Sequence, residues 1–376
     1  MAKIRVLIVD DSVVIRRLLS VYLSSDPDIE IVGTAPDGKI GLAKISQVNP
    51  DIVILDVEMP VMDGLETLAA LRKIYKTLPV IMFSTLTQRG ATSTLDALAL
   101  GASDYATKST EEGTARQHAC AELIPKIKAL CHREPPETMP VVAASRVKSD
   151  DVRTYKAGPV SSGPIDIVTI GVSTGGPSAL AALITGLSVN FPVPVVIVQH
   201  MPQMFTRMLA ERLASLSGFS IKEGVAGELL RPGEMWVAPG GLHMEVEKTF
   251  NGIRLRTHEG PPENSCRPAV DVLFRSVAQV YGSRALAVVL TGMGHDGLRG
   301  CETIRESGGR VLAQDEATSV VWGMPGAVSR AGLAEKVLPL HELAQEMNRL
   351  VNVGPHRTEK PIARGLVSCA HSPAAL

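Results

Sequence analysis

Short apolar runs alternate with stretches of helical periodicity along the first 130 residues. The runs are IRVLIV (4–9), IEIVGT (29–34), DIVILD (51–56), PVIMFS (79–84) and ASDYATK (102–108), and helical patterns such as SVVIRRLLSVYLSS separate them. Continuous Val and Ile runs between helices are typical of a parallel sheet buried on both faces. The pattern predicts a doubly wound, five-stranded α/β domain of the flavodoxin-like type over residues 1–130.

Regular structure is predicted to stop at residue 131 and to resume at residue 164. Residues 131–163 mix prolines with polar residues, so they cannot bury enough surface to offset ordering entropy, and we expect a flexible linker. The later runs IDIVTIGV, PVPVVIVQH, ALAVVLTG, GRVLAQ and AEKVLPL predict a second, mostly parallel α/β domain over residues 164–353. The alternating stretch EMWVAPGGLHMEVEKTFNGIRLRTHEG, with a turn signal at Asn251-Gly252, predicts an antiparallel hairpin insert. Residues 354–376 are expected to be a disordered tail.

Composition narrows the function classes. The 376 residues carry a net charge of −1 and no dense run of Lys and Arg, which argues against a nucleic-acid partner. No apolar stretch is long enough to insert into a bilayer, and the start offers no secretory cleavage site, so a cytoplasmic protein is expected. The five cysteines are scattered without metal-ligand spacing, and none is assigned a role.

Polar residues gather at the predicted carboxyl ends of the first five strands, where ligands bind in open parallel sheets. They are Asp10, Asp11, Asp56, Ser84 and Lys108. Carboxylates in one crevice suit Mg²⁺, and with the metal bound a phosphoryl group could be transferred to one of them. Lys108 would then neutralise the phosphoryl charge, and Ser84 would hydrogen-bond to it. Each residue taken singly is more often a cap or a turn residue, but their joint placement favours function.

With these residues in view, residues 1–130 resemble the receiver domain of bacterial response regulators. The resemblance implies Mg²⁺ ligands at Asp10, Asp11 and Asp56, phosphorylation of Asp56 in DVEMPVMDG by a histidine kinase, and switch residues at Ser84, Tyr105 and Lys108.

A Gly-x-Ser-x-Gly pattern around Ser173 marks the start of the second domain. The spacing is that of a strained strand-to-helix turn that exposes a serine hydroxyl. His200 closes the next apolar run and Asp296 follows ALAVVL, so three strand ends would supply a nucleophile, a base and an orienting acid. A nucleotide-binding loop is the alternative, but the acidic residue or the Lys-Ser/Thr pair that it needs is missing.

Three other histidines compete for the role of the base. His243 and His258 lie on the predicted hairpin insert, and His295 adjoins Asp296, which makes a relay between these two side chains awkward. His200 is favoured by its position at a strand end.

The motifs GVSTGGP, VQHMP, APGGLHM, RPAVDVLF, LTGMGHDG and WGMP in the second domain resemble the catalytic domain of the CheB family, the chemotaxis protein-glutamate methylesterases. The resemblance implies that Ser173, His200 and Asp296 hydrolyse glutamate γ-methyl esters on chemoreceptors, release methanol and also deamidate glutamines. It implies an oxyanion hole at the Thr174 and Met293 backbones, and no cofactor in this domain. Arg267 is a candidate substrate contact.

The two domains together predict a phosphorylation-activated enzyme in which the receiver shields the esterase. The alternative is a phosphorylation-dependent interaction protein whose triad is vestigial.

Overall fold

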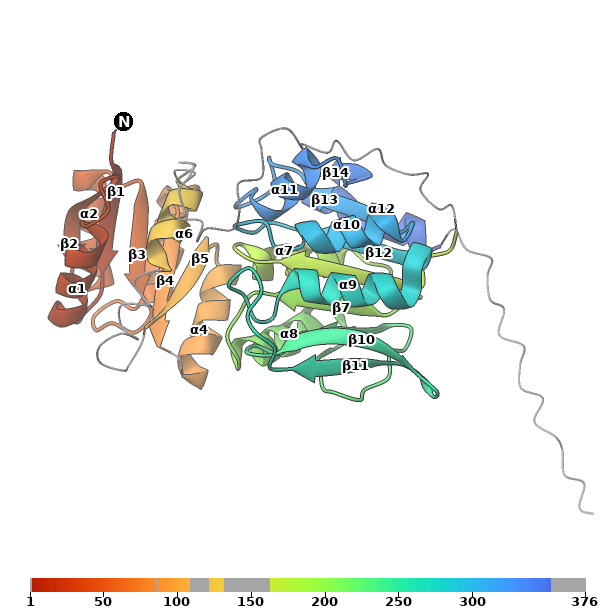
Figure 1. The fold of residues 1–376 in the computed structure, drawn as a ribbon. Coiled ribbons are helices and arrows are strands. Elements are labelled where there is room, and N and C mark those ends of the chain that lie inside the picture. Colours follow the sequence, from red (N-terminus) through yellow and green to blue (C-terminus); the bar gives the residue numbers. More distant parts are fainter. Residues whose placement is uncertain (1, 86, 109–121, 132–162, 353–376) are drawn as a thin grey trace, which may run out of the picture.

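The computed structural model describes residues 2–85, 87–108, 122–131 and 163–352, which form two α/β domains joined in sequence by residues that lie outside this description (Figure 1). The predicted linker (131–163) and tail (354–376) fall almost wholly on those residues, so both stay predictions.

The N-terminal domain is built on a five-stranded parallel sheet in the order β2-β1-β3-β4-β5, which is the flavodoxin-like order predicted from the sequence. Its strands are β1 (Ile4–Val9), β2 (Ile29–Ala35), β3 (Ile52–Asp56), β4 (Val80–Thr85) and β5 (Asp104–Lys108). The described helices are α1 (Val13–Leu23), α2 (Gly38–Val48), α3 (Gly64–Ile74), α4 (Gln88–Ala99) and α6 (Leu123–Leu130).

Helices begin where short polar side chains can cap them. Ser12, Asp37, Asp63 and Thr87 each accept a hydrogen bond from the third residue of the helix that follows, which satisfies an otherwise unpaired backbone donor. Because each capped helix start follows the carboxyl end of a strand, the loops that carry the site residues are fixed at that edge of the sheet.

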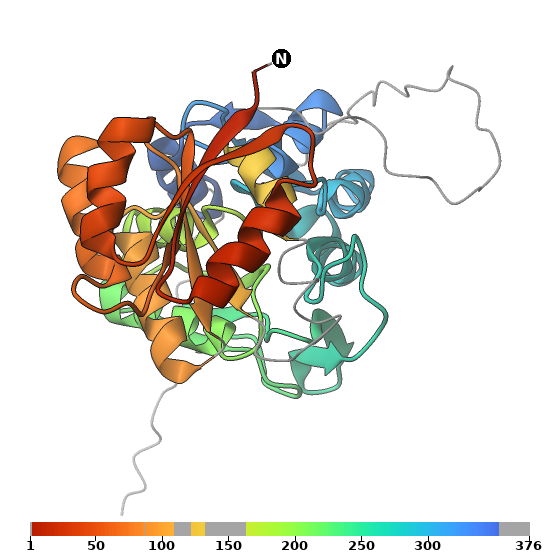
Figure 2. The ribbon, with the colours of Figure 1, turned by 90° about the vertical axis from the view of Figure 1, so that its left-hand side faces the viewer.

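Alternate strand residues point to opposite faces of this sheet. One face packs against α2, α3 and α4 through Leu7, Val9, Val53 and Leu55. The other face packs against α1 and α6 through Ile4, Val6 and Ile8. The sheet is therefore covered on both faces, as Figure 2 shows from the receiver side.

The C-terminal domain contains a seven-stranded parallel sheet in the order β14-β13-β12-β6-β7-β9-β8. Its strands are β6 (Ile167–Val172), β7 (Val195–Gln199), β8 (Ser220–Glu223), β9 (Glu234–Val237), β12 (Ala285–Val289), β13 (Arg310–Gln314) and β14 (Lys336–Leu338). A separate antiparallel pair, β10 (His243–Thr249) and β11 (Gly252–His258), turns at Asn251-Gly252 as predicted.

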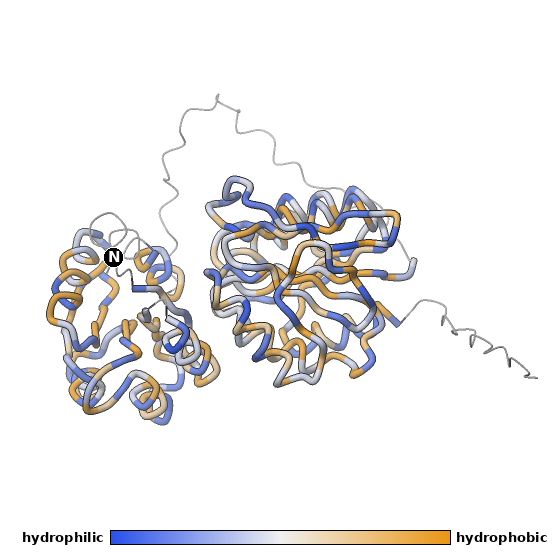
Figure 3. Tube along the Cα trace, turned by 90° about the horizontal axis from the view of Figure 1, so that it is seen from below, coloured by the Kyte–Doolittle hydropathy of each residue, from blue (hydrophilic) through white to orange (hydrophobic). Residues whose placement is uncertain are grey.

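Helices cover both faces of the larger sheet as well. One face carries α7 (Gly176–Thr185), α8 (Phe205–Ser217) and α12 (Leu340–Val351). The other carries α9 (Val270–Tyr281), α10 (Leu298–Glu306), α11 (Met324–Arg330) and the hairpin, with the 3-10 turn η1 (Gly282–Arg284) between α9 and β12. In Figure 3 the helices around both sheets carry hydrophobic and hydrophilic stretches side by side, as expected for helices with one buried face.

One detail of the predicted insert is wrong. The alternating pattern includes the segment EMWV, but this segment forms β9, which runs parallel to β7 inside the main sheet. Met235, Trp236 and Val237 are all buried, so the strand has two covered faces and does not expose one of them as a hairpin strand would. None of the helices in the described residues is long and apolar enough to cross a membrane.

Candidate active and phosphorylation sites

Two groups of polar side chains occupy the carboxyl edges of the two sheets. In the N-terminal domain, Asp10, Asp11 and Asp56 offer ligand atoms that lie within 4.8 Å of one another. Lys108 from the end of β5 joins two of them, with its Nζ 2.8 Å from Asp10 Oδ2 and 2.6 Å from Asp56 Oδ2. The structure thus brings these four predicted residues together.

Burial controls the charge of Asp56. Desolvation raises the pKa of this carboxyl to about 6, although the ion pair and hydrogen bond with Lys108 act in the opposite direction, and the nearby Asp10 adds a further rise. A second cation would stabilise the ionised form of this crowded acid cluster.

The donor set of this cluster fits Mg²⁺, because it consists of carboxylate oxygens gathered beside a single lysine. Asp10, Asp11 and Asp56 would hold the metal, which would neutralise charge on a phosphate at this edge. Lys108 already sits where it could pair with that phosphate.

Two of the three predicted switch residues, Ser84 and Tyr105, make their described contacts outside the acid cluster. Ser84 Oγ donates to the carbonyl of Gly90 in the first turn of α4, at 3.1 Å. Tyr105 is buried, and its ring stacks on Phe205 of α8 with centroids 5.1 Å apart. Tyr105 therefore belongs to the contact between the two domains.

Ser173 follows β6, at the carboxyl edge of the larger sheet. Its backbone N–H donates to Thr291 O at 3.0 Å, and its carbonyl accepts from Gln199 Nε2 at 2.9 Å and from Gly176 N at 2.8 Å. Gln199 Nε2 also donates to His200 O, so one amide side chain ties the segments of both residues together. Sequence reasoning missed Gln199, because glutamine at a strand end has no specific signature.

The turn after Ser173 differs from the strained turn predicted. The left-handed residue is Gly175, with φ of +77°, and Ser173 is not among the positive-φ residues of the described chain. A Cβ at Gly175 would lie 2.6 Å from Val320, so both conformation and space require glycine. Gly176 N–H is used by the Ser173 carbonyl and cannot serve an oxyanion.

His200 and Asp296 form a direct pair from the ends of β7 and the loop after β12. His200 Nε2 lies 2.8 Å from Asp296 Oδ2. Because β12, β6 and β7 are adjacent in the sheet, the three segments that carry Ser173, His200 and Asp296 meet at one edge. Among the hydrogen bonds of the described residues, none joins the Ser173 hydroxyl to His200.

Asp296 is held by a ring of donors. Its carboxylate accepts from the backbone N–H groups of Val270 (2.7 Å), Asp271 (3.0 Å) and Gly297 (3.0 Å), and from Asn264 Nδ2 (2.8 Å). Burial alone would raise the pKa of Asp296, but the hydrogen bond and charge of His200 and these N–H groups outweigh it and lower the pKa. Asn264 and the two amides at the start of α9 were not predicted, since backbone donors leave no mark in a sequence.

The pKa of His200 is raised to about 9. Burial acts to lower it, but hydrogen bonds to Asp296 and Cys266 and the charges of both partners prevail. Cys266 Sγ lies 3.6 Å from the other ring nitrogen, Nδ1. The sequence assigned this cysteine no role.

Two of the three competing histidines are engaged elsewhere. His243 is buried, with Nδ1 3.3 Å from the backbone N–H of Ala269 and Nε2 2.9 Å from Pro261 O. His258 pairs with Glu245 at 3.3 Å, and His295 is exposed. Their surroundings favour His200 as the base.

Three predicted positions remain: Thr174, Met293 and Arg267. Thr174 is buried, and Met293 is 36% exposed in the glycine-rich loop before Asp296. Arg267 is exposed and donates to the carbonyls of Glu259 and Gly260. Their oxyanion and substrate roles stay predictions.

Comparison with known proteins places this site in a family. A protein-glutamate methylesterase/protein-glutamine glutaminase of Trichodesmium erythraeum is 53% identical over 359 residues, which cover 93% of this chain and 100% of that protein. The chain belongs to the CheB methylesterase family. The family model for CheB methylesterase matches residues 168–347, and the response regulator receiver domain matches residues 6–119.

Two further members of the CheB methylesterase family resemble the whole chain or its second domain. The enzyme of the same name from a Nocardioides species is 50% identical over 352 residues, covering 93% of this chain and 96% of that protein. The crystal structure of the Thermotoga maritima CheB methylesterase catalytic domain is 42% identical, with a TM-score of 0.49, over 50% of this chain and 99% of that one. Family membership confirms the predicted hydrolase with an attached receiver domain.

The receiver of this CheB methylesterase packs against the segment that follows Ser173. Thr174 Oγ1 donates to Asp104 Oδ2 at 3.1 Å, and Ser178 Oγ donates to Leu98 O at 3.0 Å. Asp96 on α4 pairs with Arg212 on α8.

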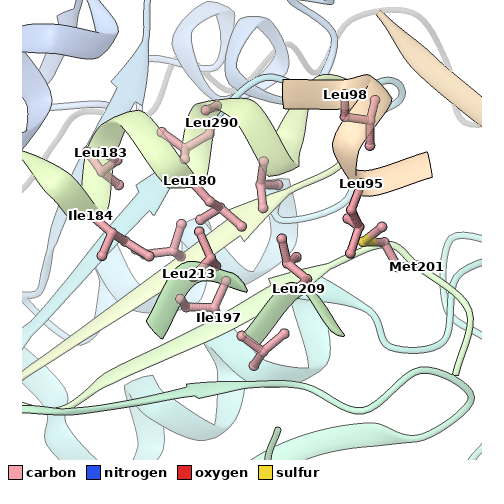
Figure 4. Packing of buried hydrophobic residues seen from close by; sticks show 14 of the residues in the cluster. Leu95, Leu98, Leu180, Leu183, Ile184, Ile197, Met201, Leu209, Leu213 and Leu290 are labelled. Atoms are coloured by element: carbon pink, nitrogen blue, oxygen red, sulfur yellow. The ribbon is translucent and has the colours of Figure 1, made fainter. Parts of the chain in front are cut away.

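Apolar side chains complete this contact between the domains. In Figure 4, Leu95 and Leu98 of α4 point toward Leu180 of α7 and Leu209 of α8, and all four belong to one buried cluster. The α4–β5 face of the receiver therefore touches the residues next to the candidate nucleophile.

Proposed function

We propose that the chain is a phosphorylation-activated protein-glutamate methylesterase and protein-glutamine glutaminase that acts on chemoreceptors during chemotaxis adaptation. The observation that carries the proposal is the His200–Asp296 pair at the same sheet edge as Ser173, in a chain whose relatives bear this enzyme name. Chemoreceptor substrates and a histidine kinase as phosphodonor follow from the family.

The chemistry would begin with Ser173 Oγ attacking the γ-carbonyl carbon of a methylated glutamate. Asp296 occupies His200 Nε2, so Nδ1 is the nitrogen that must take the serine proton. The same proton would pass to the departing methoxide and give methanol. Water would then release the acyl-enzyme as free glutamate, and a glutamine would follow the same course with loss of ammonia.

Asp296 would stabilise the imidazolium that forms at His200, because it is ionised and held by several N–H donors. The backbone amides of Thr174 and Met293 are the proposed donors to the oxyanion.

Regulation would act through the receiver. The contacts of Asp104 with Thr174 and of Tyr105 with Phe205 support a docked, inhibited state. Phosphorylation of Asp56 would draw Ser84 and Tyr105 inward and withdraw the α4–β5 face from α7.

The first experiment is methanol release from methylated chemoreceptor membranes, with and without a small phosphodonor and Mg²⁺. Wild type should respond to phosphodonor, and Ser173→Ala should lose the reaction by at least about a thousandfold. Ser188→Ala, which changes an exposed serine beyond α7, is the matched control. A fragment beginning after residue 150 should exceed the unphosphorylated whole chain. Equal rates would contradict shielding.

The second candidate is a phosphorylation-dependent interaction protein with a vestigial triad. The absence of a Ser173–His200 hydrogen bond among the described residues favours it. Methanol release from wild type that Ser173→Ala abolishes would exclude it. No release in any sample, together with phosphodonor-dependent binding to chemoreceptor membranes, would favour it.

A further inference from the structure

Cys266 lies beside the candidate base, in a loop that fixes its position. The backbone N–H of Cys266 donates to Glu263 O at 2.8 Å, and Glu263 N returns a bond to Cys266 O at 3.1 Å. The two residues between them, Asn264 and Ser265, both have positive φ, which makes a tight reversal. Asn264 is anchored to Asp296, so the thiol is tied to the same network as the His200 ring.

The thiol and the serine would compete for one atom. His200 Nε2 is bound to Asp296, and Nδ1 faces Cys266 Sγ at 3.6 Å. If Ser173 is the nucleophile, as proposed above, its proton must also go to Nδ1. A group attached to the sulfur would therefore lie against the nitrogen that the reaction needs.

The surroundings of Cys266 also favour a more reactive thiol than those of Cys301 and Cys131. Cys301 is fully buried, and burial raises its thiol pKa well above the ordinary value, so it should be inert. Cys131 is half-buried like Cys266, and its Sγ lies 4.0 Å from a backbone carbonyl oxygen, Asp51 O. The Sγ of Cys266 faces an imidazole, and a protonated imidazole stabilises a thiolate.

We infer that Cys266 is a thiol-modification site at which small-molecule disulfides reversibly inhibit the esterase. The Cys266 sulfur attacks one sulfur of the disulfide R–S–S–R, so that the S–S bond breaks and a mixed disulfide between Cys266 and one R–S group forms. The other R–S group leaves as a thiolate and takes up the proton lost by the cysteine. The small disulfide is the oxidant and is reduced to one thiol. An added thiol reverses the exchange and frees His200 Nδ1.

The test treats the full chain with 4,4′-dithiodipyridine and follows two readouts: the thiopyridone released at each cysteine, assigned by peptide mass spectrometry, and methanol release relative to each protein's own untreated rate. The proteins are wild type, Cys266→Ala, Cys131→Ser as the matched thiol control, and His200→Gln. Circular dichroism shows that each variant is folded before its labelling is compared.

We expect Cys266 to react about tenfold faster than Cys131, and about tenfold more slowly in His200→Gln. Wild type and Cys131→Ser should lose at least about nine-tenths of their methanol release and regain it with dithiothreitol. Cys266→Ala should keep its own untreated rate.

Full methanol release from wild type after complete labelling of Cys266 would overturn the inference, and so would equal labelling rates in wild type and His200→Gln. If untreated wild type releases no methanol, the proposed function fails and the inhibitory consequence fails with it. The pairing of Cys266 with His200 is then judged separately by the labelling rates, which need no substrate.

Discussion

At the scale of single residues, neighbouring groups set the pKa of a side chain, and His200 is the clearest case. Its pKa is raised to about 9, so the imidazole that we propose as the proton acceptor is mostly protonated at neutral pH. We expect kcat/KM to rise with pH until about pH 9. Asp296→Asn removes a cause of the raised pKa, so the rise should move to lower pH, and kcat should fall by about three to four orders of magnitude.

The control for this change is Asp271→Asn. It alters a buried acid that contacts Asn264 but not His200. A pH profile measured by methanol release that is the same for wild type and Asp296→Asn would show that Asp296 does not set the proton affinity of the base.

Burial raises the pKa of Asp56, whereas it acts to lower the pKa of His200. Its folded-state pKa, about 6, lies above the ordinary aspartate value of 3.8, so the folded protein binds more protons between these values and its unfolding free energy falls as pH rises through that window. In the presence of EDTA at about pH 7.5, Asp56→Asn should gain stability on the order of 1 kcal/mol, because a desolvated charge is removed while Lys108 keeps Asp10. Calorimetry should show the gain shrinking as pH falls from about 6, with little of it left at pH 4. A gain that is equally large there would refute this explanation.

At the scale of elements, the start of α7 depends on one glycine. Gly175→Ala places a Cβ 2.6 Å from Val320 at a φ of +77°, whereas Gly218→Ala at the end of α8 meets nothing within 4 Å at a nearly equal φ of +75°. We expect Gly218→Ala to cost about 1 kcal/mol of unfolding free energy and Gly175→Ala at least about twice that. Methanol release should fall only for Gly175→Ala, whose helix follows Ser173. Equal effects in denaturant titrations would show that space at Gly175 does not matter.

At the scale of the whole molecule, charge pairing between the domains should hold the receiver in place. Arg212→Asp would set two acids against each other where Asp96 and Arg212 now pair. Basal methanol release without phosphodonor should rise several-fold, because a lost cross-domain pair and a new repulsion weaken docking by about 1 kcal/mol or more. Adding Asp96→Arg should restore the low rate. If the double variant stays as active as the single one, the pair does not contribute to docking.

The sequence could predict most of the strands, because continuous Val and Ile runs have few alternatives. It could also predict that Asp10, Asp56 and Lys108 meet, because strand ends converge in a parallel sheet. It could not place β9, a four-residue strand whose alternation matches a hairpin equally well. It also could not foresee the contact of Cys266 with His200, which depends on a reversal at two non-glycine residues of positive φ. Long-range pairs such as Thr174 with Asp104 leave no periodic signal at all.

Leu95 and Leu98 belong to the same buried cluster as Leu180 and Leu209, so the two domains share one hydrophobic core. A protein whose modules share a core melts as a single cooperative unit, and modules that have separated melt independently. Calorimetry of the unphosphorylated chain should therefore show one transition, which divides into two once phosphodonor and Mg²⁺ are added. In these terms the proposed signal from the receiver would be a loss of cooperativity, and the number of folding units in the molecule would report whether the enzyme is inhibited or active.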